Sequence, residues 1–143
     1  MPQQPNLQRF LDAQQRDYAT ALAEIRAGRK RSHWMWYVFP QIQGLGYSET
    51  ARFYAIQNRQ EAEAYRQHPV LGLRLLEISA ALLALASTDA TRIMGSPDDV
   101  KLRSSMTLFG ALEGADPVFQ QVLDTFFGGT PDAKTLQILR QHP

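Results

Sequence analysis

Apolar residues that recur at every third or fourth position are the feature that most restricts how this chain can fold. That spacing places them on one face of an α-helix, and no segment shows convincingly the alternation of a half-buried strand. Composition agrees, since Ala and Leu supply 17 residues each whereas Val and Ile supply 5 and 6, and the first pair favours helices. The sequence therefore predicts an all-α domain of about seven or eight short helices.

The first helix is expected at residues 7–27, with Gly28 as its stop signal. Further helices are expected where a capping residue or a proline precedes an apolar pattern. Such starts lie at Ser48, Asn58 with Glu61, His68-Pro69, Ser96-Pro97, Asp116-Pro117 and Thr130-Pro131. The helix after His68-Pro69 has leucines on two faces, which predicts that it forms the buried centre of the bundle.

The length of 143 residues and the net charge of +1 indicate one folded domain rather than a disordered chain. We expect residues 7–143 to form this domain and residues 1–6, which are polar and contain proline, to be a disordered tail. Neither a secretory signal nor an apolar run of the roughly 20 residues that span a bilayer is visible. Cysteine is absent, which excludes disulfides and thiolate metal sites. We expect a cytoplasmic protein without membrane association.

Residues 28–46 (GRKRSHWMWYVFPQIQGLG) depart from a plain helical pattern. Three consecutive cations precede an aromatic cluster that contains both tryptophans of the chain. Cations pair with phosphate and aromatic rings stack on bases, so this composition suits a nucleotide-like or phosphorylated ligand. The candidates for substrate binding here are Arg31, Trp36 and Gln41, and His33 is a candidate catalytic acid or base.

The same residue types also have a structural interpretation. Large aromatic side chains such as Trp34 and Phe39 usually belong to the core. Arg29 and Lys30 follow a predicted helix, where cations favour the negative end of the helix dipole. His33 fits a structural histidine at least as well as a catalytic one.

The second unusual segment is KLRSSMTLF, residues 101–109. Lys101, Ser104 and Ser105 are three and four residues apart, so they share a helix face. Serine is a weak helix former, and a cation with two hydroxyl groups suits an anion or a sugar. The alternative is close helix packing, with the hydroxyl groups bonded back to the preceding turn.

Glu77 lies three residues after Arg74 in the most apolar helix, where an ion pair within the helix is the ordinary interpretation. If Glu77 faced a cavity instead, burial would raise its pKa and suit it to acid/base catalysis. We predict no metal and no cofactor, because the three histidines (His33, His68 and His142) lack the spacing of metal ligands. The glycine-rich phosphate and dinucleotide motifs are also absent.

Four blocks carry a resemblance to a known family: GRKRSHWMWYVFPQ, GLGYS, HPVLGLRLLE and PDDVKLRSSMTLF. In this order and spacing they resemble a bacterial family of domains of unknown function, number eighteen-ten, over residues 7–141. The resemblance implies a mainly helical fold and no assigned activity. Members are often automatically named calpastatin, a label that does not fit, since such an inhibitor would be a long, repetitive and disordered chain.

A more remote likeness, in size and layout, links the chain to the helical NADAR-type proteins. These are associated with ADP-ribose and N-glycosidic chemistry. No motif aligns residue by residue, so no catalytic residue is carried over from them.

The sequence therefore favours a binder or hydrolase of a nucleotide-like or phosphorylated small molecule, with ADP-ribose and N-glycosidic chemistry included. This hypothesis requires that residues 28–46 and 101–107 meet in space. A protein-interaction or structural domain without catalysis is the alternative. A nucleic-acid-binding module is least favoured, because the net charge is only +1 and such modules usually carry a larger basic footprint.

Overall fold

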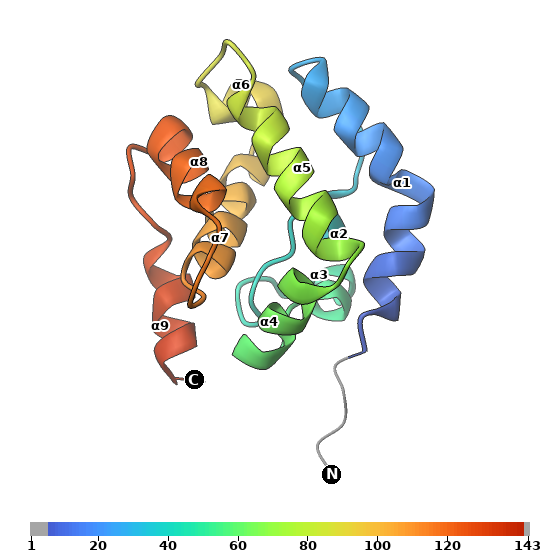
Figure 1. Cartoon of the computed structure of the whole chain (residues 1–143), viewed down its shortest axis with the longest axis vertical. Helices are drawn as coiled ribbons and strands as arrows, with labels where there is room; N and C mark the ends of the chain where they lie inside the picture. The colour runs from blue at the N-terminus through green and yellow to red at the C-terminus, as the bar shows by residue number, and fades with distance from the viewer. Residues whose placement is uncertain (1–5, 142–143) are drawn as a thin grey trace.

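The first helix, α1 (Gln8–Arg26), confirms the helix predicted at residues 7–27. The computed structural model describes residues 6–141, and within them eight further helices follow (Figure 1). These are α2 (Met35–Val38), α3 (Glu49–Tyr54), α4 (Arg59–Gln67), α5 (Leu71–Leu83), α6 (Ala90–Met94), α7 (Asp98–Gly110), α8 (Pro117–Phe127) and α9 (Ala133–Gln141). The prediction of a single all-α domain is confirmed, with two very short helices, α2 and α6, beyond those that the apolar pattern indicates. Of the predicted tail, all but Asn6 lies outside the described residues.

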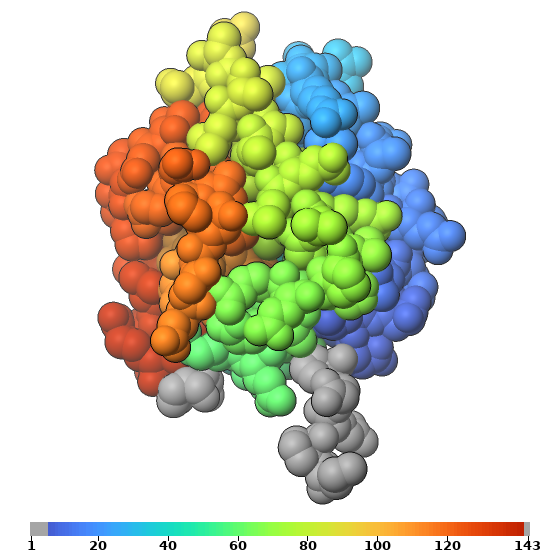
Figure 2. All heavy atoms as spheres, in the orientation of Figure 1, coloured from blue at the N-terminus to red at the C-terminus, as the bar shows by residue number. Residues whose placement is uncertain are grey.

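Helix α5 occupies a central position but is not the buried centre of the bundle. It packs against α1, α4 and α8, and it runs across the front of the molecule in Figures 1 and 2. One of its faces is buried, whereas Leu73 on the other is 66% exposed. The prediction of two buried faces is therefore wrong, because within residues 6–141 no element covers the outer face.

Helix α7 contains the longest run of consecutive buried residues within residues 6–141. All six residues from 104 to 109 are buried, including Ser104, Ser105 and Thr107. This helix packs against α8, α6, α9 and α4. The segment whose serines suggested a site is thus also the centre of the fold.

Three predicted helix starts have the expected side-chain caps. Ser48 Oγ accepts a hydrogen bond from the Ala51 amide at 3.1 Å. Asn58 Oδ1 accepts one from the Glu61 amide at 2.9 Å, and Asp116 Oδ1 accepts one from the Val118 amide at 2.8 Å. Each cap satisfies an amide that the first helical turn leaves without a partner.

The other three starts are shifted. His68 Nδ1 accepts a hydrogen bond from the Val70 amide at 3.0 Å, but α5 begins only at Leu71 and its N-cap residue, Val70, makes no side-chain cap. Helix α7 begins at Asp98 without a side-chain cap. At α9 the cap is Asp132, whose Oδ2 accepts from the Thr135 amide at 2.9 Å, and an aspartate is a better cap than the predicted threonine.

Replacing Asp116 by alanine should lower the free energy of unfolding by about 1 kcal/mol, because the Val118 amide loses its acceptor. Urea unfolding measures the change. Asp124→Ala is the matched control, since Asp124 lies on the same helix and accepts an exposed hydrogen bond from the Gln120 side chain, whose Nε2 is 2.9 Å away. Equal losses in the two variants would contradict the role of Asp116 as a cap.

Candidate functional site

Glu24, in the last turn of α1, anchors the beginning of the segment 28–46. Its Oε1 accepts hydrogen bonds from the Arg31 amide at 2.7 Å, the Ser32 amide at 2.9 Å and Trp34 Nε1 at 3.0 Å. Burial alone raises the pKa of Glu24, but the hydrogen bonds from Ser32, Arg31 and Trp34 together outweigh it and lower the pKa to about 2. The sequence analysis missed this residue, because a single glutamate near a helix end carries no distinguishing signal.

Lys30 joins the same segment to the start of α7. Its Nζ lies 2.8 Å from Asp98 Oδ2 and 4.9 Å from the centre of the Trp34 ring, and only 5% of the side chain is exposed. Trp34 and Phe39 are also buried. These contacts support the structural interpretation of Lys30, Trp34 and Phe39.

The two unusual segments meet at Trp36 and Lys101. The Lys101 Nζ lies 5.0 Å from the centre of the Trp36 ring, a cation–π geometry. It also lies 3.6 Å from Asp98 Oδ1 in the preceding turn of α7. Residues 28–46 and 101–107 therefore meet in space, as the hypothesis drawn from the sequence required.

A cavity of about 480 Å³, here called the Trp36 pocket, opens at this contact. It lies between residues 41–48 and the first turns of α3, α7 and α9. Four of the candidate binding residues line it, and several residues that the sequence analysis did not single out complete the wall. The lining consists of Trp36, Gln41, Leu45, Gly46, Tyr47, Ser48, Ala51, Pro97, Val100, Lys101, Ser104, Asp132 and Lys134.

Two lysines and one aspartate give this pocket its charge. Asp132 is occupied in capping α9, since its Oδ2 accepts hydrogen bonds from the Thr135 amide at 2.9 Å and from Thr135 Oγ1 at 2.6 Å. Lys101 is partly exposed and Lys134 is exposed. Ser104 Oγ donates to the Val100 carbonyl at 3.2 Å, as the structural interpretation expects, and keeps its lone pairs for a further donor.

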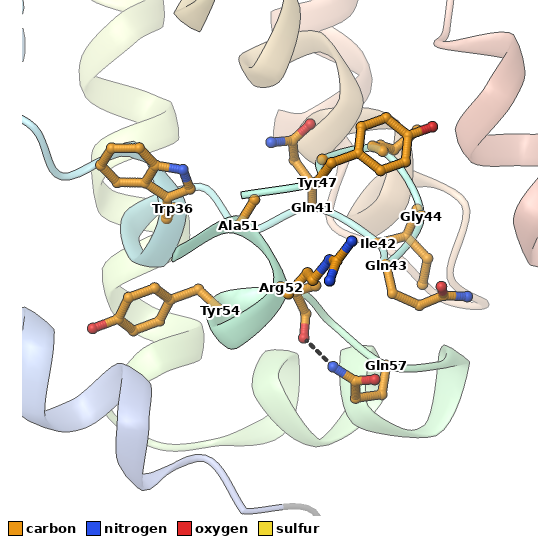
Figure 3. A pocket seen from close by; sticks show the side chains of 13 residues that line it. Trp36, Gln41, Ile42, Gln43, Gly44, Tyr47, Ala51, Arg52, Tyr54 and Gln57 are labelled. Atoms are coloured by element: carbon orange, nitrogen blue, oxygen red, sulfur yellow. Dashed lines mark hydrogen bonds between the residues drawn. The ribbon is translucent and has the colours of Figure 1, made fainter. Parts of the chain in front are cut away.

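A second cavity, the glutamine pocket, has a volume of about 370 Å³ and adjoins the first. The two share Trp36, Gln41, Leu45, Gly46, Tyr47 and Ala51. The glutamine pocket adds Gln43, Arg52 and Gln57 to the wall. Figure 3 shows Trp36 and Tyr54 on one side of this cavity and Tyr47 and Gln43 on the other.

The remaining candidate residues lie outside both cavities. His33 is exposed and lines a third hollow, which shares Trp36 with both cavities and Tyr54 with the glutamine pocket. Arg31 is exposed, and its backbone amide donates to Glu24. Ser105 is fully buried in α7, and its hydroxyl group has no hydrogen-bond partner among residues 6–141.

Glu77 lies on the seam between α1 and α5 instead of in a cavity. It is exposed, and its Oε1 accepts a hydrogen bond from the Tyr18 hydroxyl group at 2.6 Å. Arg74, the expected partner of Glu77, lies over the Tyr18 ring. Burial and the hydrogen bond to Glu77 raise the pKa of Tyr18 above its usual range. The structure therefore brings neither candidate for acid/base catalysis, Glu77 or His33, to the Trp36 pocket.

Comparison with known proteins identifies the family. Residues 4–139 match the family described as "Protein of unknown function (DUF1810)", so the chain belongs to it. The chain is similar to the conserved hypothetical protein Rv1873 from Mycobacterium tuberculosis, with 45% identity and a TM-score of 0.92 to its crystal structure. That similarity covers 94% of this chain and 96% of the other. No protein with a curated description matches the chain.

These comparisons confirm the family resemblance seen in the sequence, and they give no support to the NADAR-type likeness. Within residues 6–141, no helix is both long and apolar enough to cross a membrane. In the same part of the chain, no three His, Asp or Glu side chains form a group that could hold a metal ion.

Proposed function

We propose that the Trp36 pocket binds a small anionic molecule that carries a flat ring, of the nucleotide-like or phosphorylated class. The observation that carries this proposal is the contact between Lys101 and Trp36. It holds an ammonium group at the wall of a cavity large enough for a small molecule.

The charge of Lys101 is available to a ligand. Within residues 6–141 its one ion-pair partner is Asp98, which lies 3.6 Å from Lys101 Nζ and is closer, at 2.8 Å, to Lys30 Nζ. A phosphate oxygen placed beside Lys101 would therefore gain a charge-assisted hydrogen bond at little cost to an existing ion pair. Lys134 supplies a second positive charge on the same wall.

The rest of the lining suits the ring of such a ligand. Leu45 and Val100 are apolar, and Trp36 and Tyr47 offer aromatic surfaces. Ligand sites typically combine a mostly apolar wall with a few polar groups that fix orientation. ADP-ribose belongs to this class, since it combines a base, sugar hydroxyl groups and phosphates.

Binding rather than hydrolysis is the function that this site supports best. A general acid or base must come within hydrogen-bond reach of the bond that is cleaved. His33 and Glu77 lie outside the Trp36 pocket, and Asp132 is engaged by Thr135. The catalytic roles of His33 and Glu77 remain predictions of the sequence.

A thermal-shift panel at low salt tests the proposal. The compounds are NAD, ADP-ribose, nucleotides, sugar phosphates and short oligonucleotides. A ligand at about 100 times its dissociation constant should stabilise the fold by about 2.7 kcal/mol. We expect one class of anionic compound to give such a shift.

Lys101→Ala should weaken that ligand's binding about tenfold or more, because a charge-assisted hydrogen bond is lost. Isothermal titration calorimetry measures the affinity. Arg140→Ala is the control, since it removes one exposed cation that lines neither cavity. Unchanged binding by a folded Lys101→Ala protein would refute the proposed role of the pocket.

A protein-interaction surface is the second candidate function, and a specific observation favours it. Tyr47 is 73% exposed and Val100 is 56% exposed on the lining of the Trp36 pocket, and Phe53 nearby on α3 is 58% exposed. Exposed apolar groups of this kind often mark partner sites. The nucleic-acid-binding hypothesis is favoured even less than before, because the Lys30 side chain is buried and paired with Asp98. It therefore does not belong to an open basic patch.

A further inference from the structure

The glutamine pocket contains polar side chains that phosphate binding at Lys101 does not explain. Gln41 and Gln43 both line it. Among the side chains drawn in Figure 3, the one engaged in a hydrogen bond is Gln57, whose Nε2 donates to the Ala55 carbonyl at 3.0 Å. Figure 3 draws no hydrogen bond from the side-chain amide of Gln41 or Gln43 to the other residues that line this cavity.

The backbone that carries these two glutamines is fixed in place. The Gln43 amide donates to the Ile56 carbonyl at 2.8 Å, and the Ile56 amide donates to the Gln41 carbonyl at 2.8 Å. Between the glutamines, Ile42 forms a parallel bridge with Ile56, and both isoleucines are buried. Side chains held on a fixed backbone lose less freedom when they bind a ligand.

Two primary amides suit the edge of a nucleobase. Each amide presents a donor and an acceptor side by side, and a glutamine can pair with adenine through both. The aromatic rings of Trp36, Tyr47 and Tyr54 line the same cavity and offer surfaces on which a base can stack. The cavity therefore combines the two contacts by which proteins recognise bases.

The glutamine pocket and the Trp36 pocket also share part of their lining. Gly46 and Ala51 line both cavities. They approach so closely that a Cβ atom at Gly46 would stand 2.7 Å from the Ala51 Cβ. Position 46 therefore has no room for a side chain, and a ligand that spans the two cavities would run along the residues that line both.

We infer that the two cavities hold a single two-part ligand, a nucleoside phosphate. Its base lies in the glutamine pocket, where Gln43 binds the polar edge, and its phosphate pairs with Lys101 in the Trp36 pocket, with Gln41 on the lining that the two cavities share. This inference rests on the proposed function and adds the orientation of the ligand and the residues that determine base specificity.

The test compares ligands with and without a base. Ribose 5-phosphate and the four common nucleoside monophosphates are titrated by calorimetry into the wild type and into the Gln43→Ala, Gln41→Ala and Lys101→Ala variants. Gln57→Ala is the matched control, because Gln57 lines the same cavity but its amide is already bonded to Ala55. Thermal unfolding confirms that each variant is folded.

At least one monophosphate should bind more tightly than ribose 5-phosphate. Gln43→Ala should weaken that monophosphate about tenfold and leave ribose 5-phosphate unchanged, because Gln43 lines only the glutamine pocket of the two. Gln41→Ala should also weaken the monophosphate, but Gln41 lines both cavities. Lys101→Ala should weaken both kinds of ligand, and Gln57→Ala should weaken neither.

The other outcomes overturn the inference in distinguishable ways. If ribose 5-phosphate binds through Lys101 but no base adds affinity, the orientation is wrong and the proposed function stands. The same conclusion holds if Gln43→Ala weakens every ligand equally or none. If no phosphorylated compound binds, the proposed function and this inference both fail.

Discussion

A Gly72→Ala variant should lose about 3 kcal/mol or more of its free energy of unfolding, the largest effect that the structure implies for a single methyl group. A Cβ atom at position 72 would stand 2.0 Å from the carbonyl oxygen of Arg66 and 3.0 Å from its carbonyl carbon. Both are backbone atoms at the end of α4, so no side-chain rotation relieves the clash. The Gly72 amide also donates to the His68 carbonyl at 2.9 Å, which fixes the distance between α4 and α5.

Gly110→Ala provides the matched control for this variant. Gly110 also lies in a helix, but its added Cβ would meet the nearest atom, Phe119 Cβ, at 3.4 Å. Helix propensity favours alanine over glycine by about 1 kcal/mol, so the control should be as stable as the wild type or slightly more stable. Urea unfolding compares the two variants. Similar stabilities would contradict the close packing of α4 on α5.

The second large effect is expected from Glu24→Gln, which should lower the free energy of unfolding by about 2 kcal/mol at neutral pH. Three donors point at one carboxylate oxygen of Glu24. Hydrogen bonds to a charged group are stronger than those to a neutral amide. The buried Trp34 indole would therefore keep only a weaker acceptor.

This contribution should depend on pH in a defined direction. The pKa of Glu24 is lowered to about 2 in the folded chain, whereas an ordinary glutamate titrates near about 4.3. A depressed pKa stabilises the fold above the ordinary value, and that stabilisation disappears as the pH falls toward 2. The difference between the wild type and Glu24→Gln should therefore shrink between about pH 5 and pH 2.

Urea unfolding at several pH values measures this difference. Glu113→Gln is the control, because Glu113 is exposed, and its effect should be small throughout. A wild-type advantage over Glu24→Gln that stays constant down to pH 2 would contradict the role of the Glu24 charge.

Local sequence signals predicted the helices well and their burial less well. The caps at Ser48, Asn58 and Asp116 lie within three residues of the amides they satisfy, so the sequence contains the whole interaction. The burial of α5 depends on which elements cover it. Apolar residues on two faces of a helix do not indicate which face other elements will cover. The exposure of Leu73 was therefore not predicted.

For the candidate site too, the sequence predicted what depends on local composition and missed what depends on contacts between distant segments. Composition pointed to Trp36, Gln41, Lys101 and Ser104, and the structure brings these four to one cavity. The carboxylate of Glu24 and the pairing of Lys30 with Asp98 were missed, because each depends on a contact between segments that only the tertiary fold creates. A periodic pattern carries no information about such contacts.

The two tryptophans of the chain allow the most direct test of ligand binding at the Trp36 pocket. Trp34 is buried and its indole N–H donates to Glu24, whereas Trp36 lines the pocket beside Lys101. The measurement is the pair of indole N–H signals in a nitrogen–proton correlation spectrum, titrated with AMP and with ADP-ribose. We expect the Trp36 signal to shift saturably with at least one of them, while the Trp34 signal stays in place. A Trp36 signal that does not move with either compound would contradict the account.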